Sequence, residues 1–89
     1  MISASFIDTG TYEVVVDGDV ETVHRVRMSQ DYYKKLCGGT VTHEWVLINA
    51  FQFLLEREPN TAILTEFELP LIGRYFPEFE DAMAQRLNR

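Results

Sequence analysis

Cysteine, long apolar runs and basic residues are all scarce in this 89-residue sequence. The single cysteine, Cys37, has no second thiol in the chain with which to form a disulfide, which is typical of a reducing compartment. No apolar run reaches the roughly 18 residues that a membrane-spanning helix needs. The opening residues, MISASFIDTG, carry no basic residue before their short apolar stretch, so they do not resemble a secretory signal. We therefore expect a cytoplasmic protein that does not enter a membrane.

Positive charge is outweighed, because 14 acidic residues stand against 8 basic ones and the net charge is −6. This balance has the wrong sign for general binding to the phosphate backbone of nucleic acids. The basic residues are nevertheless clustered, with a group formed by Arg25, Arg27, Lys34 and Lys35. Residues 56–81 are predominantly acidic instead. We expect the basic group to be a solvated face or a docking surface for the acidic region.

Motifs of familiar catalytic chemistry are also missing. A metalloprotease helix would need a second histidine four residues after His43, and that position holds Leu47. The glycine pair after Cys37 lacks the lysine of a phosphate-binding loop. Cys37 and His43 could pair as nucleophile and base, or could bind a metal ion together with His24. Either site would need a further group, and the sequence shows none beside them. We predict no enzymatic activity, no cofactor and no metal ion.

What the sequence does contain is one markedly apolar stretch, residues 42–58, THEWVLINAFQFLLERE. Its interior is so poor in polar residues that a helix here would be apolar on nearly every side. Thr42 is a suitable N-cap, and Pro59 ends the helix near residue 57 or 58. One narrow seam would face water, formed by Trp45, Asn49, Gln52 and Glu56. The stretch predicts a long central helix that is buried on nearly every side.

The N-terminal half predicts a β-hairpin followed by a short helix. Residues 12–16 and the alternating residues 20–28 are the strands, and Asp17-Gly18 between them favours the positive φ of a tight turn. The packed face of the second strand would hold Val20, Thr22, His24, Val26 and Met28. Ser29 is suited to cap the helix that Gly38 ends. Residues 1–10 show no clear pattern and would extend the first strand or fray.

Prolines divide the C-terminal region into short helices. The helix after Pro59 would carry Ile63, Leu64 and Phe67. Pro70 and Pro77 suit the first turns of two more. In the last of these helices, Phe79, Met83 and Leu87 recur every four residues and form a narrow apolar stripe. Arg86 and Arg89 at its C-terminal end match the helix dipole.

These elements together predict an α+β fold in a single domain over residues 1–89. In chain order it comprises an N-terminal β-hairpin, a short helix, a long buried central helix and short C-terminal helices. A chain of this length buries only roughly 60 to 65% of its unfolded surface. Because the central helix is apolar nearly all round, we expect a partner copy to complete its cover in a homodimer.

Residues 53–80, FLLEREPNTAILTEFELPLIGRYFPEFE, resemble a segment shared by a group of short bacterial proteins of uncharacterised role. The similarity extends over residues 12–83. It implies a bacterial protein, but it brings no activity with it.

The order of strand, short helix, glycine turn and longer apolar helix also resembles the architecture of ribbon-helix-helix DNA-binding proteins. In that family two strands from two chains pair and enter the major groove. The resemblance implies that residues 20–28 read DNA, with Arg25 and Arg27 on the bases and Thr42 and His43 on phosphate. The net acidity and Glu44, at the start of the longer helix, depart from this pattern.

The densest aromatic segment, residues 74–79, suggests a different function. It carries the candidate protein-interaction residues Arg74, Tyr75, Phe76 and Phe79. Tyrosine, phenylalanine and arginine are enriched at the centres of protein interfaces, although the same aromatics could simply fold the tail onto the central helix. We therefore expect a small non-enzymatic protein-interaction or regulatory module. The alternative is a ribbon-helix-helix regulator or antitoxin.

Overall fold

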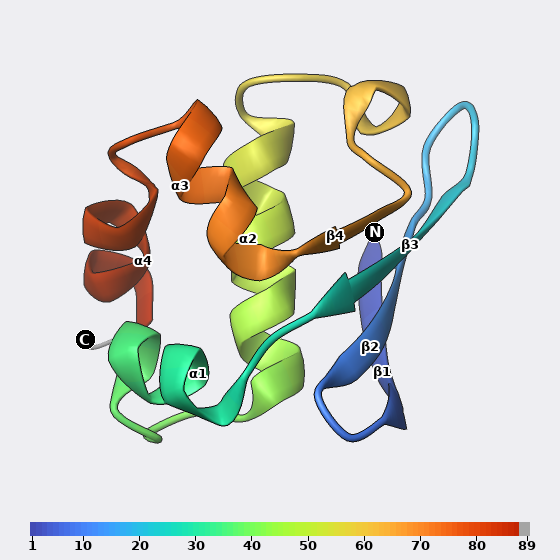
Figure 1. Ribbon diagram of the computed structural model, residues 1–89. Helices are drawn as coiled ribbons and strands as arrows, with labels where there is room; N and C mark the ends of the chain where they lie inside the picture. The colour runs from blue at the N-terminus through green and yellow to red at the C-terminus, as the bar shows by residue number, and fades with distance from the viewer. Residues whose placement is uncertain (88–89) are drawn as a thin grey trace.

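The computed structural model describes residues 1–87 and has an α+β fold, with the strands leading (Figure 1). In chain order the elements are β1 (Ile2–Asp8), β2 (Thr11–Val16), β3 (Thr22–Arg27), α1 (Gln30–Cys37), α2 (His43–Leu55), η1 (Asn60–Ala62), β4 (Glu66–Glu68), η2 (Leu69–Leu71), α3 (Ile72–Tyr75) and α4 (Phe79–Leu87), where η1 and η2 are 3-10 turns. Arg89, expected at the end of the last helix, lies outside the described residues. Among residues 1–87, no helix combines the length and apolar character needed to cross a bilayer.

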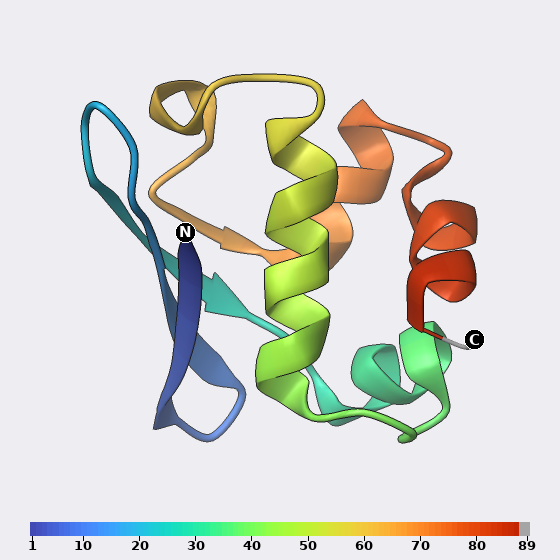
Figure 2. The same cartoon turned by 180° about the vertical axis from the view of Figure 1, so that it is seen from behind.

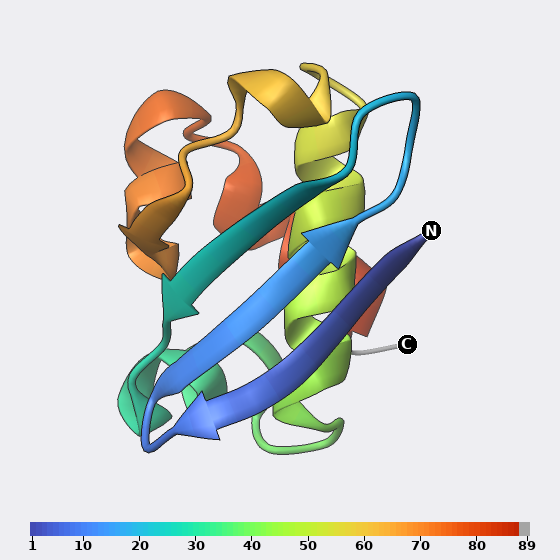
Figure 3. The same cartoon turned by 90° about the vertical axis from the view of Figure 1, so that its right-hand side faces the viewer.

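The four strands form one sheet in the order β1-β2-β3-β4. The first three strands run antiparallel, and β4 lies parallel to β3. Figure 3 shows this sheet from its open side, with the helices packed behind it. A sheet that is covered on one face should alternate buried and exposed residues, and β2 and β3 do so.

The predicted hairpin is confirmed by β2 and β3, which pair Tyr12 with Val26 and Val14 with His24. Its turn is not the tight one expected, because Gly18 does not have a positive φ. Residues 17–21 form a longer loop there. The left-handed glycine lies instead at Gly10 (φ 74°), in the short turn between β1 and β2. Residues 2–8 thus form a strand of their own, which the sequence pattern did not predict.

Both helices that follow the hairpin begin at the predicted caps. The Ser29 hydroxyl accepts a hydrogen bond from the Tyr32 N–H, and the Thr42 hydroxyl accepts one from the Trp45 N–H, each at 3.1 Å. Gly38, in the left-handed region at φ 66°, ends α1 as predicted. These side chains supply partners that the first turn of a helix lacks.

Helix α2 ends at Leu55, slightly earlier than expected. Its buried residues are Val46, Leu47, Asn49, Ala50, Phe51, Phe53 and Leu54. The predicted polar seam is only partly right. Gln52 and Glu56 are exposed, and Trp45 retains 47% of its surface. Asn49, in contrast, is buried and donates a hydrogen bond to the Trp45 carbonyl at 2.9 Å.

The segment after Pro59 differs from the predicted helix. Only the turn η1 forms there, and Phe67 lies in the strand β4 opposite Val26 of β3. Three residues carry too little local pattern to reveal a strand, and the pairing partner lies far away in the sequence. The two segments opened by Pro70 and Pro77 are helical, as predicted.

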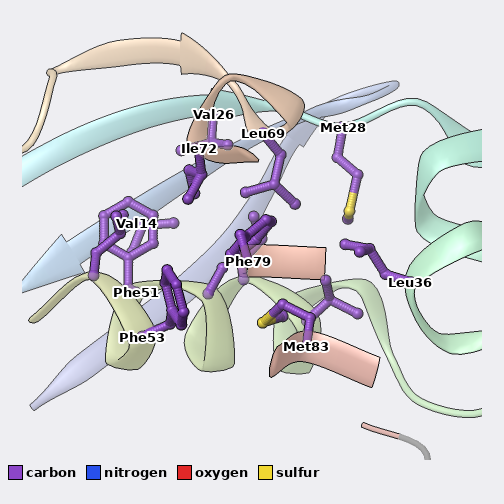
Figure 4. Packing of buried hydrophobic residues seen from close by; sticks show 14 of the residues in the cluster. Val14, Val26, Met28, Leu36, Phe51, Phe53, Leu69, Ile72, Phe79 and Met83 are labelled. Carbon is purple, nitrogen blue, oxygen red and sulfur yellow. The ribbon is translucent and has the colours of Figure 1, made fainter. Parts of the chain in front are cut away.

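One core joins the sheet to the helices (Figure 4). Phe51 and Phe53 of α2 project into it together with Val14 and Val26 of the sheet. The predicted stripe on the last helix is confirmed, because Phe79, Met83 and Leu87 of α4 are all buried. Cys37 is fully buried too, as expected for a small apolar residue next to the glycine turn.

Candidate functional site

A groove opens between the C-terminal end of α2 and the elements that follow it, with a volume of about 420 Å³. Every lining residue except Glu58 is apolar or aromatic, the set being Leu54, Glu58, Ala62, Ile63, Leu64, Phe67, Leu71, Ile72, Tyr75 and Phe76. In Figure 1 the end of α2, η1 and α3 lie in the upper half of the molecule, and β4 lies just below them. An apolar groove of this size suits apolar side chains better than polar chemistry.

The groove has a buried floor and an exposed rim. Ile63, Phe67 and Ile72 are buried. On the rim, Leu64 keeps 49% of its surface and Tyr75 keeps 66%. Large apolar side chains left this exposed beside a concave apolar surface are typical of interaction sites.

The wall that carries Leu64 is fixed by a buried histidine. His24 is fully buried, in agreement with its predicted place on the packed face of the second strand. Its Nδ1 lies 2.7 Å from the Leu64 carbonyl oxygen, and its Nε2 lies 2.8 Å from the Thr22 hydroxyl. Because a carbonyl can only accept, Nδ1 must carry a proton. The imidazole therefore ties the groove wall to β3.

Three further hydrogen bonds hold the same wall. Asn60 Nδ2 donates to the Val20 carbonyl at 2.8 Å and to the Thr22 hydroxyl at 3.0 Å. The Arg25 N–H donates to the Thr65 carbonyl at 2.7 Å. The loop between α2 and β4 is thereby pinned to the sheet, which gives the groove a preformed shape.

The candidate segment at residues 74–79 divides between this groove and the core. Tyr75 and Phe76 line the groove, and Arg74 is exposed in the last turn of α3. Phe79 is fully buried, with its ring 5.2 Å from that of Phe53, and Phe76 lies 5.9 Å from the same ring. Thus Phe76 and Phe79 fold the tail onto α2, and Tyr75 is the exposed aromatic residue of the segment.

Sequence patterns did not identify the other half of the groove. Ile63, Leu64 and Phe67 were expected on one short helix after Pro59. The closest signal available was the apolar pair Ile63-Leu64 between polar residues, and this pattern is common in core segments as well. Glu58, the carboxylate at the groove, gave no signal at all.

The candidate DNA-contact residues lie on opposite sides of the sheet. Arg25 and Arg27 are exposed on β3, in positions that alternate with residues buried beneath α2. Thr42 is used as the cap of α2, and His43 Nε2 lies 3.0 Å from Gln30 Oε1. The fold therefore does not bring these four residues to one surface.

The β3 strand is also paired on both sides, with β2 on one and β4 on the other. Glu13 and Glu66 lie opposite Arg25 in these pairings. Arg27 forms ion pairs with Glu66 at 3.1 Å and with Glu68 at 4.0 Å. Each arginine thus has carboxylates beside it.

The expectation that the basic group docks the acidic region is confirmed for Arg27 and also for Lys35. Lys35 Nζ lies 3.1 Å from a Glu80 oxygen, and the Tyr32 hydroxyl donates to the same carboxylate at 3.0 Å. These hydrogen bonds, first from Lys35 and then from Tyr32, hold the pKa of Glu80 below its usual value. Burial and the neighbouring carboxylate raise the pKa of Tyr32.

Cys37, His24 and His43 do not form a common site. The Cys37 thiol donates to the Tyr33 carbonyl at 3.4 Å, and the His43 ring stacks on that of Tyr33 with 3.7 Å between centroids. His24 is occupied by the groove wall. Within residues 1–87, no three histidine, cysteine or acidic side chains gather in a way that could hold a metal ion.

Compared with known proteins, the chain matches no protein-family model, no curated protein and no solved structure. The resemblances to short bacterial proteins and to ribbon-helix-helix proteins therefore stay predictions. What the groove can do must follow from its own chemistry.

Proposed function

We propose that this chain is a non-enzymatic protein-interaction module, acting as a homodimer, and that its groove receives an apolar segment of a protein partner. The observation that carries the proposal is the pairing of a buried apolar floor with the exposed rim residues Leu64 and Tyr75. A groove that bound nothing would leave these side chains in water without benefit.

The chemistry of the groove favours an amphipathic helix with basic residues as its occupant. Strand addition is poorly supported, because the edge strand β4 has only three residues and two of them are glutamates. Helices instead bury apolar side chains spaced three and four residues apart in such grooves. Glu58 at the groove and the net charge of −6 favour positive charge on the partner.

A peptide titration tests this proposal. The probe is a short synthetic amphipathic helix of leucine and lysine, added to isotope-labelled protein and followed by NMR. We expect the largest shift changes at Ile63, Leu64 and Ile72. The double variant Leu64→Ser/Tyr75→Ser should raise the Kd about tenfold or more, since two apolar contacts are lost.

The matched control is Val20→Ser/Val23→Ser, which removes two apolar side chains of similar exposure, 58% and 48%, outside the groove. It should leave the peptide Kd unchanged. Equal weakening by both double variants, or shift changes centred away from the groove, would mean that binding is generic and that the groove is not the site.

The ribbon-helix-helix alternative has weaker support. In that family the reading strands of two chains pair with each other, whereas β3 already has a neighbour on each side. Carboxylates beside Arg25 and Arg27 oppose the approach of phosphate. We therefore place protein interaction first and DNA recognition second.

A further inference from the structure

The strand β1 forms one edge of the sheet, with β2 along one side and no strand along the other within residues 1–87 (Figure 3). Met1 and Asp17 exchange backbone hydrogen bonds, with N to O distances of 2.9 and 3.5 Å. In an antiparallel ladder the bonded residues alternate. The N–H and C=O groups of Ile2, Ala4 and Phe6 therefore point away from β2.

This edge lacks the features by which natural sheets block pairing with another chain. Proteins protect such edges with lysine, proline or very short strands. The seven residues of β1 include no proline and no basic residue, and residues 2–7 carry no charge at all. A bulge interrupts the pairing only near its end, between Phe6 and Asp8. The opposite edge, β4, is short and acidic.

Apolar side chains are exposed along the same strand. Phe6 keeps 60% of its surface although its ring packs edge-on against Tyr12 at 6.0 Å, and Ile7 keeps 42%. Ile2, Ala4 and Phe6 alternate onto the face that α2 covers. Figure 2 shows α2 beside β1 on the side turned toward the viewer.

We propose that this surface is the interface of a two-fold dimer, in which the β1 strands of two copies pair antiparallel about Ala4. The occupant of the edge is then a second copy of this chain. This inference deepens the proposed function, because it rests on the homodimer stated there. The sheets of the two copies join into one continuous sheet, with the helices of both copies on the same face.

Self-complementarity favours a second copy and this register. Pairing about Ala4 sets Ile2 of each copy opposite Phe6 of the other and so covers the exposed ring. Ser3 then lies opposite Ser5, and no charged residues face each other within residues 2–7, so like-charge repulsion is absent. Pairing about Ser5 would instead set the Asp8 carboxylate against Ile2.

Sedimentation equilibrium on the full chain tests the surface. We expect the wild type to have about twice the 10.3 kDa chain mass at micromolar concentration. Phe6→Lys places a charge in the seam and should raise the dimer Kd about tenfold or more. The control Val20→Lys replaces a residue of similar exposure, 58%, in the loop between β2 and β3 and should remain dimeric. A Phe6→Lys protein with the same dimer Kd as the wild type would overturn the proposal.

Cross-linking tests the register without relying on a charge substitution. Ser3 and Ser5 face solvent and would form a non-bonded pair with Cα atoms about 4.5 Å apart, close enough for a disulfide. A mixture of Ser3→Cys and Ser5→Cys proteins should cross-link on mild oxidation, whereas each alone should not. Cross-linking of Ser5→Cys alone would overturn the Ala4 register.

The outcomes separate this interface from the groove. A monomeric wild type would refute the dimer but leave peptide binding at the groove intact. A dimeric wild type and a Phe6→Lys variant with the same dimer Kd would retain the homodimer and reject β1 as its interface. Loss of peptide binding in the Leu64→Ser/Tyr75→Ser variant would bear on the groove alone.

Discussion

Truncation of Phe51 is the most direct test of how much the fold depends on α2. The Phe51 side chain is fully buried. Its ring centroid lies 5.2 Å from that of His24 on β3 and 6.1 Å from that of Phe67 on β4. It therefore joins the helix to the two strands that hold the groove wall. Phe51→Ala removes this contact and leaves a cavity that the surrounding rigid elements can fill only in part.

The expected loss is about 3 to 5 kcal/mol, as for other buried phenylalanines cut to alanine. A chain of 89 residues has a total stability of about 4 to 13 kcal/mol, taking roughly 0.05 to 0.15 kcal/mol per residue. The substitution would therefore remove between a quarter and all of the stability. For a domain of this size, each kcal/mol lowers Tm by about 4 to 8 °C.

The assay is thermal and urea unfolding followed by circular dichroism. We expect the Tm of Phe51→Ala to fall by about 12 °C at least, or the protein to be unfolded at 25 °C. Phe51→Leu, which keeps most of the volume, should lose less than about 1.5 kcal/mol. A near-native Tm for Phe51→Ala would refute the central role of α2.

Three further predictions concern the groove wall, acid stability and DNA. His24→Ala should lower stability by about 2 to 4 kcal/mol in urea unfolding, and His24→Asn should recover part of it by restoring a donor; equal losses would refute the hydrogen-bond account. Because the folded pKa of Glu80 is lowered, its contribution is present above the unfolded value of about 4.3 and is lost as pH falls through the folded pKa. The free energy of unfolding should therefore fall less steeply with decreasing pH in Glu80→Gln and in Lys35→Met than in the wild type. An unchanged pH dependence in both variants would contradict this. Random duplex DNA should bind more weakly than about 10 micromolar at 150 mM salt in anisotropy titrations, and tighter, salt-sensitive binding abolished by Arg25→Ala/Arg27→Ala would promote the DNA-binding alternative.

The sequence alone determined the features that depend on neighbours within a few residues. Ser29 and Thr42 cap their helices because each hydroxyl reaches an N–H three residues on. Gly38 ends α1 because it adopts the left-handed conformation at little cost. The alternation along β3 and the stripe on α4 were likewise readable, since each follows the geometric period of its element.

Tertiary structure decided the features whose partners lie far along the chain. The strand β4 forms because it pairs with β3, with Phe67 opposite Val26. Its three residues have no sequence pattern that distinguishes a strand from a helix or a loop. The groove wall is held in place by the hydrogen bond between His24 and the Leu64 carbonyl, 40 residues away in the sequence. The β1 strand is stabilised by its pairing with β2, and the sequence of residues 2–8 alone does not predict this pairing. Caps and periodic patterns depend on residues that are close together in the sequence. A groove and a sheet edge arise only when the folded chain brings distant segments together.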